Sequence, residues 1–377
     1  MRILHIGYRL HNRPFPNKRC SSDKDHILSK MKTSEFQYHL PEELIAQQPV
    51  EPRDDSRLMV LRRSDSSLEH RTFREIDEFL SDGDVLVFNN SRVIPARITG
   101  SKLTTGGRAE ILLLRMLDTN VWEALVKPAK RIKKGCRLLL ESSNVDGKEC
   151  GAVITEVSEE KEGGIRVIHF PKDGFYGTAS SVALPPYIKT PLKDEERYQT
   201  VYADASGSVA APTAGLHFTT ALIERIKQKG VKCLFITLHI GLDTFLPVRE
   251  SDPRGHRIHR EYGLMDSEVA SHLSRARNNG KRIVCVGTTT ARLLEAVAQK
   301  CGVDSLKAFQ GWVDLFILPG YQFQMVDALV TNFHLPCSTL LMMVAAFAGK
   351  ENIFSAYRKA VEEGYRFYSF GDAMLIL

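Results

Sequence analysis

The stretch Thr331-Asn332-Phe333-His334-Leu335-Pro336-Cys337-Ser338-Thr339-Leu340 joins two apolar segments that predict the core of an α/β fold. Residues 327–330 before it predict a buried strand, and residues 340–348 after it predict a buried helix that ends at Gly349. Between these elements lie an amide, an imidazole and two hydroxyls, whereas a structural turn needs only one capping group. Because open α/β sheets bind ligands at the ends of their strands, this junction predicts a ligand site.

The composition is typical of a soluble globular protein with two or three domains. The 377 residues are 43% hydrophobic and 25% charged, and no apolar run is long enough to span a bilayer. The seven cysteines include no C-x-x-C pair, which argues against a disulfide framework or a cysteine-based zinc site and favours a reducing cytoplasm. The net charge of +6 does not indicate a nucleic-acid partner, because residues 1–30 hold seven Lys or Arg against two Asp. A local basic patch elsewhere stays open.

Residues 1–30 differ in character from the rest of the chain. They are basic, polar and aperiodic, and they lack the apolar segment of a signal peptide. We expect either a disordered tail or a start codon assigned too far upstream, since the segment that begins at Met31 looks like a natural start.

The remaining sequence predicts an α/β domain with a β-rich insert. Residues 96–183 show short β-rich runs between glycines and charged turns, which predicts a small antiparallel β-barrel. Strands alternate with helices on both sides of it, so residues 31–95 and 184–377 predict a three-layer α/β/α sandwich with a mostly parallel sheet. The strands expected in the insert are residues 109–114, 121–127, 137–140, 151–157 and 165–170. Those expected in the sandwich are strands 58–61, 85–88, 233–238, 282–286, 315–318, 328–330 and 373–377, and helices 73–80, 219–229, 266–278, 288–300 and 340–348.

Polar side chains follow three of the expected parallel strands. They are His239 and Asp243, then Thr288, Thr289 and Arg292, and then Asn332 and His334. Because the carboxyl ends of parallel strands lie at one edge of a sheet, we expect these groups to converge there.

The segment Gly287-Thr288-Thr289-Thr290-Ala291-Arg292 suits an anion or carboxylate at a helix N-terminus. Capping of the helix by a threonine side chain is the alternative. Neither a P-loop nor a G-x-G-x-x-G fingerprint occurs in the chain, so a conventional dinucleotide site is disfavoured.

Two other features carry both a functional and a structural interpretation. The small-residue run 207–218 ends near His217, and it either lets a ligand approach the backbone or allows tight packing. Asp372 precedes an apolar chain end that predicts a buried strand, so it is either a ligand or an acceptor for backbone N–H groups.

Charged residues in two loops predict contacts with a polar partner. His256-Arg257-Ile258-His259-Arg260-Glu261 has ligand types for zinc but lacks the H-E-x-x-H spacing, so contact with an anionic substrate or a solvated loop is favoured over a metal. Arg92 and Arg97 suit a phosphate or carboxylate clamp, with a salt bridge at the domain junction as the alternative.

Together these motifs closely resemble the S-adenosylmethionine:tRNA ribosyltransferase-isomerase family of queuosine biosynthesis. The most distinctive are LPEELIAQQP at 40–49, VFNNSRVIPAR at 87–97, LPPYI at 184–188 and RYQTVY at 197–202. Further matching segments are 209–218, 237–248, 287–295, 311–342 and 365–376. The resemblance runs from about residue 33 to the chain end and leaves out residues 1–30.

The resemblance implies a reaction in which S-adenosylmethionine is a consumed substrate and no cofactor or metal is needed. Its ribosyl moiety is transferred and isomerised onto 7-aminomethyl-7-deazaguanine at the tRNA wobble position, giving epoxyqueuosine-tRNA, adenine and methionine. The family expectation is a monomeric pentosyltransferase in the cytoplasm, with tRNA as partner and no membrane association. The alternatives are a non-enzymatic RNA-binding module and an S-adenosylmethionine-dependent tRNA methyltransferase, neither of which would release adenine.

The resemblance and the strand-end positions together suggest roles for individual residues. The acid or base candidates are His217, His239 and His334, with Asp243 and Asp372 as orienting groups or partners of the sulfonium. The candidates for substrate binding are Thr288, Thr289, Arg292, Asn332, Ser338 and Thr339. The candidates for tRNA contact are Arg92, Arg97, His256, His259 and Arg260.

Overall fold

The computed structural model describes residues 31–140, 153–161, 164–171, 179–241 and 247–377. The chain splits into two compact units, Met1–Met31 and Lys32–Leu377, and every element below belongs to the second. The predictions for residues 1–30 and for Asp243 therefore lie outside the described residues. Within the described ranges, no helix combines the length and apolar character needed to cross a membrane.

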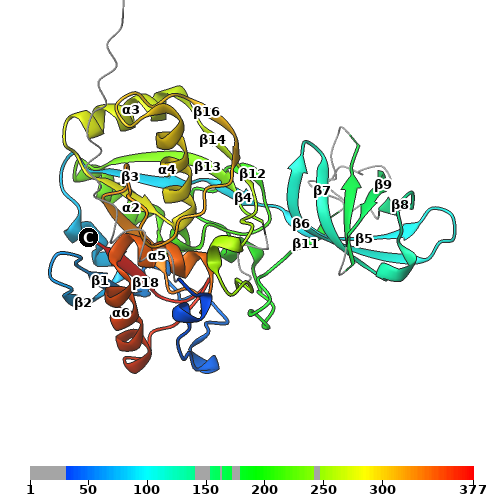
Figure 1. Cartoon of the computed structure of the whole chain (residues 1–377), viewed down its shortest axis with the longest axis horizontal. Helices are drawn as coiled ribbons and strands as arrows, with labels where there is room; N and C mark the ends of the chain where they lie inside the picture. Colours follow the sequence, from blue (N-terminus) through cyan, green and yellow to red (C-terminus); the bar gives the residue numbers. More distant parts are fainter. Residues whose placement is uncertain (1–30, 141–152, 162–163, 172–178, 242–246) are drawn as a thin grey trace, which may run out of the picture. The chain divides into compact units, whose positions relative to one another are not determined.

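A nine-stranded mixed sheet forms the centre of this unit (Figure 1). In order across the sheet, its strands are β16 (Phe309–Val313), β14 (Glu261–Met265), β13 (Lys232–His239), β3 (Val85–Asn89), β15 (Ile283–Val286), β17 (Ala328–Asn332), β18 (Ala373–Ile376), β1 (Arg57–Leu61) and β2 (Leu68–Thr72). The four strands β13, β3, β15 and β17 pair in parallel, and so do β18 and β1. The other neighbours are antiparallel, so the parallel pairing of the predicted, mostly parallel sheet is concentrated at its centre.

Helices cover both faces of the sheet. They are α2 (Thr220–Gln228), α3 (Ser267–Asn278), α4 (Thr288–Cys301), α5 (Thr339–Ala348) and α6 (Lys350–Glu362). Strand residues Leu86, Val284 and Val330 form one buried apolar cluster with Leu222 and Ile226 of α2. Because neighbouring strand residues point to opposite faces, α3 and α4 contact β13 and β15 from the other side. The predicted three-layer α/β/α architecture is thereby confirmed.

A second sheet closes into a six-stranded antiparallel barrel (Figure 1). Its strands are β5 (Pro95–Lys102), β6 (Arg108–Asp118), β7 (Val121–Lys127), β10 (Ile165–His169), β9 (Val153–Glu160) and β8 (Arg137–Leu140), and β8 pairs back onto β5. A further strand, β11 (Ala179–Val182), lies beside β5. Alternate side chains such as Ile98, Ile111 and Trp122 fill the interior, which confirms the predicted barrel. The exact domain boundaries stay a prediction.

Two predicted elements differ from the structure. Residues 315–318 form no strand; the strand is β16, whose Trp312 pairs with Tyr262 of β14 in antiparallel register. The segment predicted as a helix at 73–80 is a 3₁₀ helix, Phe73–Phe79. The sequence pattern also gave no prediction for α6.

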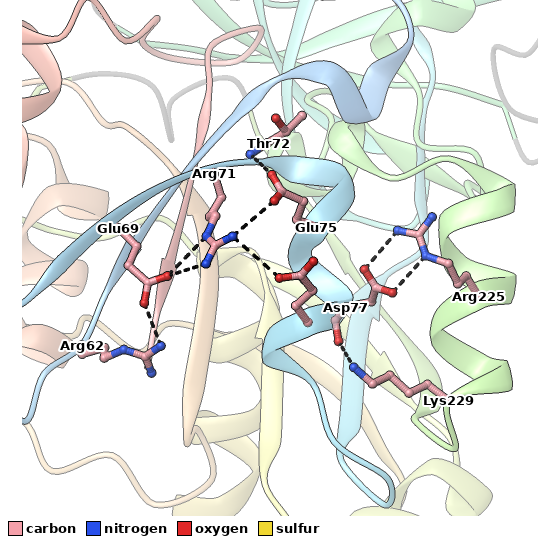
Figure 2. Close-up of polar contacts among 9 residues, drawn as sticks. Arg62, Glu69, Arg71, Thr72, Glu75, Asp77, Arg225 and Lys229 are labelled. Atoms are coloured by element: carbon pink, nitrogen blue, oxygen red, sulfur yellow. Dashed lines mark hydrogen bonds and ion pairs between the residues drawn. The ribbon is translucent and has the colours of Figure 1, made fainter.

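Ion pairs link β2 and the 3₁₀ helix after it to neighbouring arginines, including one on α2 (Figure 2). Asp77 of this helix accepts hydrogen bonds from Arg225 of α2, with Nε–Oδ2 at 2.9 Å. Glu69 of β2 accepts from Arg62 at 3.0 Å and from Arg71 at 3.2 Å. Since most of these side chains are at least one-third exposed, each pair contributes at most about 1 kcal/mol.

Candidate active site

The carboxyl ends of β13, β3, β15 and β17 lie side by side at one edge of the central sheet. The residues at these ends are His239, Asn89, Gly287 and Asn332. The predicted convergence of the polar strand ends is confirmed for these described residues.

A small open cavity of about 30 Å³ lies at this edge. We call it the strand-end cavity; its lining comprises Ala211, Pro212, Thr213, Ala214, Ile240, Gly287, Thr288, Thr289, Thr331, Asn332, His334 and Leu340. It unites the small-residue run with four predicted substrate or acid–base residues: Thr288, Thr289, Asn332 and His334. Four chain segments that are far apart in sequence thus supply one site.

The N-terminus of α4 opens onto the strand-end cavity without a side-chain cap. The N-cap residue is Gly287, whose φ of 92° is readily adopted only by glycine. Capping by a threonine side chain is therefore not the role of Thr288 or Thr289, and both line the cavity. Asn89 donates to Thr289 Oγ1 at 3.4 Å, which holds that side chain against the end of β3. The first N–H groups of a helix and its dipole suit an anionic ligand group.

His334 is buried in the wall of the strand-end cavity. Its Nε2 lies 2.7 Å from Thr331 Oγ1, its backbone N–H donates to the Tyr357 hydroxyl at 2.9 Å, and its carbonyl accepts from Tyr38. Burial lowers the pKa of His334 to about 3, so its imidazole is neutral near pH 7.

His217 lies behind the cavity and is hydrogen-bonded through both ring nitrogens. Nδ1 is 2.8 Å from Ser56 Oγ, and Nε2 accepts from the Asn332 amide at 3.2 Å. Burial lowers the pKa of His217 to about 4 although the Asp372 carboxylate opposes that shift. Asn332 also accepts from Thr213 at 3.0 Å, so it links His217 to the cavity wall.

His239 occupies a neighbouring hollow at the end of β13. That hollow is lined by Arg115, Met116, Trp122, Gly207, Val209, His239, Ile240, Gly241, Arg260, Glu261, Tyr262 and Trp312. The Nδ1 atom of His239 is buried and has no hydrogen-bond partner among the described residues. Burial lowers the pKa of His239 to about 4. Since Ile240 lines both hollows, His239 lies next to the strand-end cavity rather than in it.

Three predicted site residues make contacts that explain them structurally. Asp372 is buried and accepts from the backbone N–H groups of Arg57 at 3.1 Å and Arg366 at 2.8 Å, as the structural alternative expected. Arg292 forms a buried ion pair with Glu261 and does not line the strand-end cavity. Ser338 caps α5 by accepting from the backbone N–H of residue 341 at 3.1 Å, and Thr339 is the first residue of that helix.

The residues predicted to contact tRNA divide between two regions. Arg92 pairs with Glu196, and Arg97 lies on β5 of the barrel. His256, His259 and Arg260 line a separate large hollow. Among the described residues, no group of three His, Cys, Asp or Glu side chains is arranged to hold a metal ion, and His256 Nδ1 instead contacts a carboxylate, Glu250, at 2.9 Å.

Sequence reasoning did not assign a role to several residues that shape the site. Asn89 carries a usable signal because it directly follows a buried strand, and its side chain accepts from the backbone N–H of Leu238 at 3.0 Å. Ser56 and Thr213 carry no such sequence signal, because their partners His217 and Asn332 are more than 100 positions away in the chain.

A small hollow adjoins the strand-end cavity. It is lined by Tyr187, Thr213, Asn332, Phe333, His334, Leu335, Ser338, Leu340, Tyr368 and Ser369.

Comparisons with known proteins agree on one family. The family described as "Queuosine biosynthesis protein" matches residues 33–376. The chain is 53% identical over 350 residues to the S-adenosylmethionine:tRNA ribosyltransferase-isomerase of Dehalococcoides mccartyi (strain CBDB1), covering 92% of this chain and 100% of the relative. It is 50% identical over 350 residues, with the same coverage, to the Clostridioides difficile (strain 630) protein of the same name. The crystal structure of S-adenosylmethionine tRNA ribosyltransferase from Thermotoga maritima is similar with a TM-score of 0.52 and 42% identity, covering 91% of this chain and 100% of that chain.

Proposed function

The chain belongs to the queuosine biosynthesis protein family, and from this membership we propose that it is an S-adenosylmethionine:tRNA ribosyltransferase-isomerase. It transfers the ribosyl moiety of S-adenosylmethionine to 7-aminomethyl-7-deazaguanine at the tRNA wobble position and isomerises it. The products are epoxyqueuosine-tRNA, adenine and methionine, which makes the enzyme a pentosyltransferase. The names of the relatives support this function rather than an RNA-binding module or a methyltransferase.

The strand-end cavity is the observation in this structure that carries the proposal. It combines a helix N-terminus suited to a carboxylate with a neutral, buried imidazole suited to proton transfer. The methionine part of the substrate carries a carboxylate, and its sulfonium acidifies the neighbouring ribose 5′ carbon. The same cavity therefore offers one group for binding and one for deprotonation.

His334 is the proposed base. Thr331 Oγ1 lies 3.4 Å from the Asn332 carbonyl, so its hydroxyl proton has an acceptor there, and His334 Nε2–H in turn donates to Thr331 Oγ1. In this tautomer the ring contact with Thr331 uses Nε2, and the lone pair lies on Nδ1. A lone pair on a buried, neutral imidazole is the group that general base catalysis requires.

His217 is the proposed positioning residue. Its Nε2 accepts a hydrogen bond from the Asn332 amide, and its Nδ1–H is then directed to Ser56, so neither nitrogen is available without breaking a hydrogen bond. Through Asn332 it fixes the wall of the cavity on which His334 also depends.

Thr288 and Thr289, with the free N–H groups that begin α4, form the proposed binding site for the methionine carboxylate. The unit acts without a cofactor on a consumed substrate, and we propose a cytoplasmic monomer with the barrel, residues 96–183, as an inserted domain.

Release of adenine from S-adenosylmethionine tests the proposed function. The wild-type chain is expected to release adenine only when tRNA bearing the 7-aminomethyl-7-deazaguanine base is present, whereas a methyltransferase would form S-adenosylhomocysteine and a binding module would release nothing. His334→Gln is expected to lower kcat by 100-fold or more. His217→Gln keeps a hydrogen-bonding side chain and is expected to lose less. Wild-type turnover in His334→Gln would overturn the assignment of the base.

A further inference from the structure

A large hollow between the barrel and the edge of the central sheet has no role in the chemistry above. Its volume is about 750 Å³, and we call it the basic groove. The groove is lined by Arg115, Met116, Leu117, Glu123, Lys161, Arg254, His256, Arg257, Ile258, His259, Arg260, Trp312, Asp314 and Phe316. Strands β6 and β14 contact each other beside it, so both parts of the unit supply its walls.

Cations outnumber carboxylates in the basic groove. Glu123 is buried and binds both Arg115 and Lys161, and the exposed Asp252 neutralises Arg254. Those contacts account for three of the cations that line the groove.

Arg257 and Arg260 are different, because both are exposed and neither forms an ion pair with a described carboxylate. Two unpaired guanidinium groups on one surface suit the phosphates of a polyanion.

An aromatic ring lies at the inner end of the groove. Trp312 is half-buried; Tyr262 faces it across the β14–β16 pair, with ring centroids 5.2 Å apart and planes at 72°. The Arg260 guanidinium lies 5.7 Å from the centre of the same indole. Tyr262 packs edge-on against the indole and holds it in place, and the exposed part of Trp312 suits it to stack against a planar base.

The groove continues toward the strand-end cavity. It shares Trp312 and Arg260 with the hollow that holds His239, and that hollow shares Ile240 with the strand-end cavity. A chain of phosphates in the groove would therefore bring one extruded base past Trp312 toward the reacting centre.

We propose that the basic groove binds the single-stranded anticodon loop, with Arg257 and Arg260 on its phosphates and Trp312 stacked on a base. This inference rests on the proposed function, since it names how the tRNA of that reaction is held. A single strand is favoured over a duplex because stacking on Trp312 needs an unstacked base.

Tryptophan fluorescence tests the stacking, because the chain contains only two tryptophans and Trp122 is buried inside the barrel. A hairpin RNA carrying the anticodon loop is expected to quench the wild-type emission in a saturable manner. Trp312→Phe is expected to bind the RNA without the quench, and Trp312→Leu to raise Kd about 5- to 150-fold. The same stem closed into a continuous duplex is expected to compete poorly.

Salt dependence tests the phosphate contacts independently of Trp312. Arg257→Gln is expected to reduce the slope of log Kd against log salt concentration by about 1, whereas the matched control Arg108→Gln, an exposed residue outside the groove, is expected to leave it unchanged. Equal competition by hairpin and duplex, or a quench that survives in Trp312→Phe, would overturn the stacking. An unchanged slope in Arg257→Gln would overturn the phosphate contact.

Adenine release separates the two proposals. If the wild type releases adenine but the groove variants bind hairpin RNA normally, the groove is overturned and the proposed function stands. If the wild type binds the hairpin with a Trp312-dependent quench but releases no adenine with precursor tRNA, the proposed function fails and the groove stands.

Discussion

Replacing Asp372 by alanine is expected to unfold the protein more readily, not to remove a catalytic group. The buried carboxylate accepts from the Arg57 N–H at 3.1 Å, the Arg366 N–H at 2.8 Å and the Arg366 guanidinium at 3.0 Å. Each buried donor left without an acceptor costs about 1–3 kcal/mol, and the Arg366 side chain, 29% exposed, recovers part of its loss by contact with water. We therefore expect a loss of about 3–5 kcal/mol.

Chemical unfolding followed by circular dichroism measures this loss, and adenine release under native conditions provides the second readout. Asp372→Asn keeps one acceptor oxygen and is expected to lose less stability than Asp372→Ala. The folded fraction of both variants is expected to retain turnover. An alanine variant whose stability lies within about 1 kcal/mol of the wild type, but whose turnover is abolished, would refute the structural role and return Asp372 to the catalytic candidates.

Three further predictions concern other parts of the structure. The folded pKa of His334, about 3, lies below the usual 6.5, so only the unfolded chain binds this proton as the pH falls from 6.5. This group alone is expected to lower stability by about 1.4 kcal/mol per pH unit, and a pH series of unfolding midpoints should show a slope that is shallower by that amount in His334→Gln. In Gly207→Ala the new Cβ would lie 2.8 Å from the His239 ring at a φ of 146°, so a loss of about 1–3 kcal/mol is expected in thermal unfolding, and an unchanged midpoint would contradict the close approach. Arg225→Ala removes an ion pair between the half-exposed Arg225 and Asp77, and it is expected to cost about 1 kcal/mol in the same assay. A much larger loss would show that Figure 2 depicts a cooperative network.

Elements were predictable where local apolar patterning and tertiary pairing agree. The central strands β3, β15 and β17 are short apolar runs whose residues are buried on both faces, so their sequence alone identifies them. Residues 315–318 have the same pattern but no pairing strand, and Pro319 follows them directly. The strand β16 instead contains Gly311, which weakens its local signal, and it forms because β14 supplies an antiparallel partner.

The candidate site was predictable in position but not in its contacts. Parallel strands bring their carboxyl ends together, which is why Asn332 and His334 were found from sequence order alone. Their hydrogen bonds come from distant segments: Tyr38 reaches the His334 carbonyl from 296 positions away. The position of Arg292 after a strand end predicted a ligand contact. In the structure its side chain is buried beside Glu261 and forms an ion pair with that carboxylate instead.

The low pKa of His334 bears directly on how one residue can serve the proposed reaction twice. The chemistry first removes a proton from the ribose 5′ carbon and later protonates the departing adenine. A neutral imidazole is fully available as the base at pH 7, because its pKa is about 3. Once protonated in this buried environment, it becomes a strong acid and readily passes its proton to adenine. Weak basicity makes the first step harder, so the sulfonium beside the ribose 5′ carbon must stabilise the negative charge that develops there. On this argument a single imidazole shuttles the proton, and His217 need only hold the cavity wall.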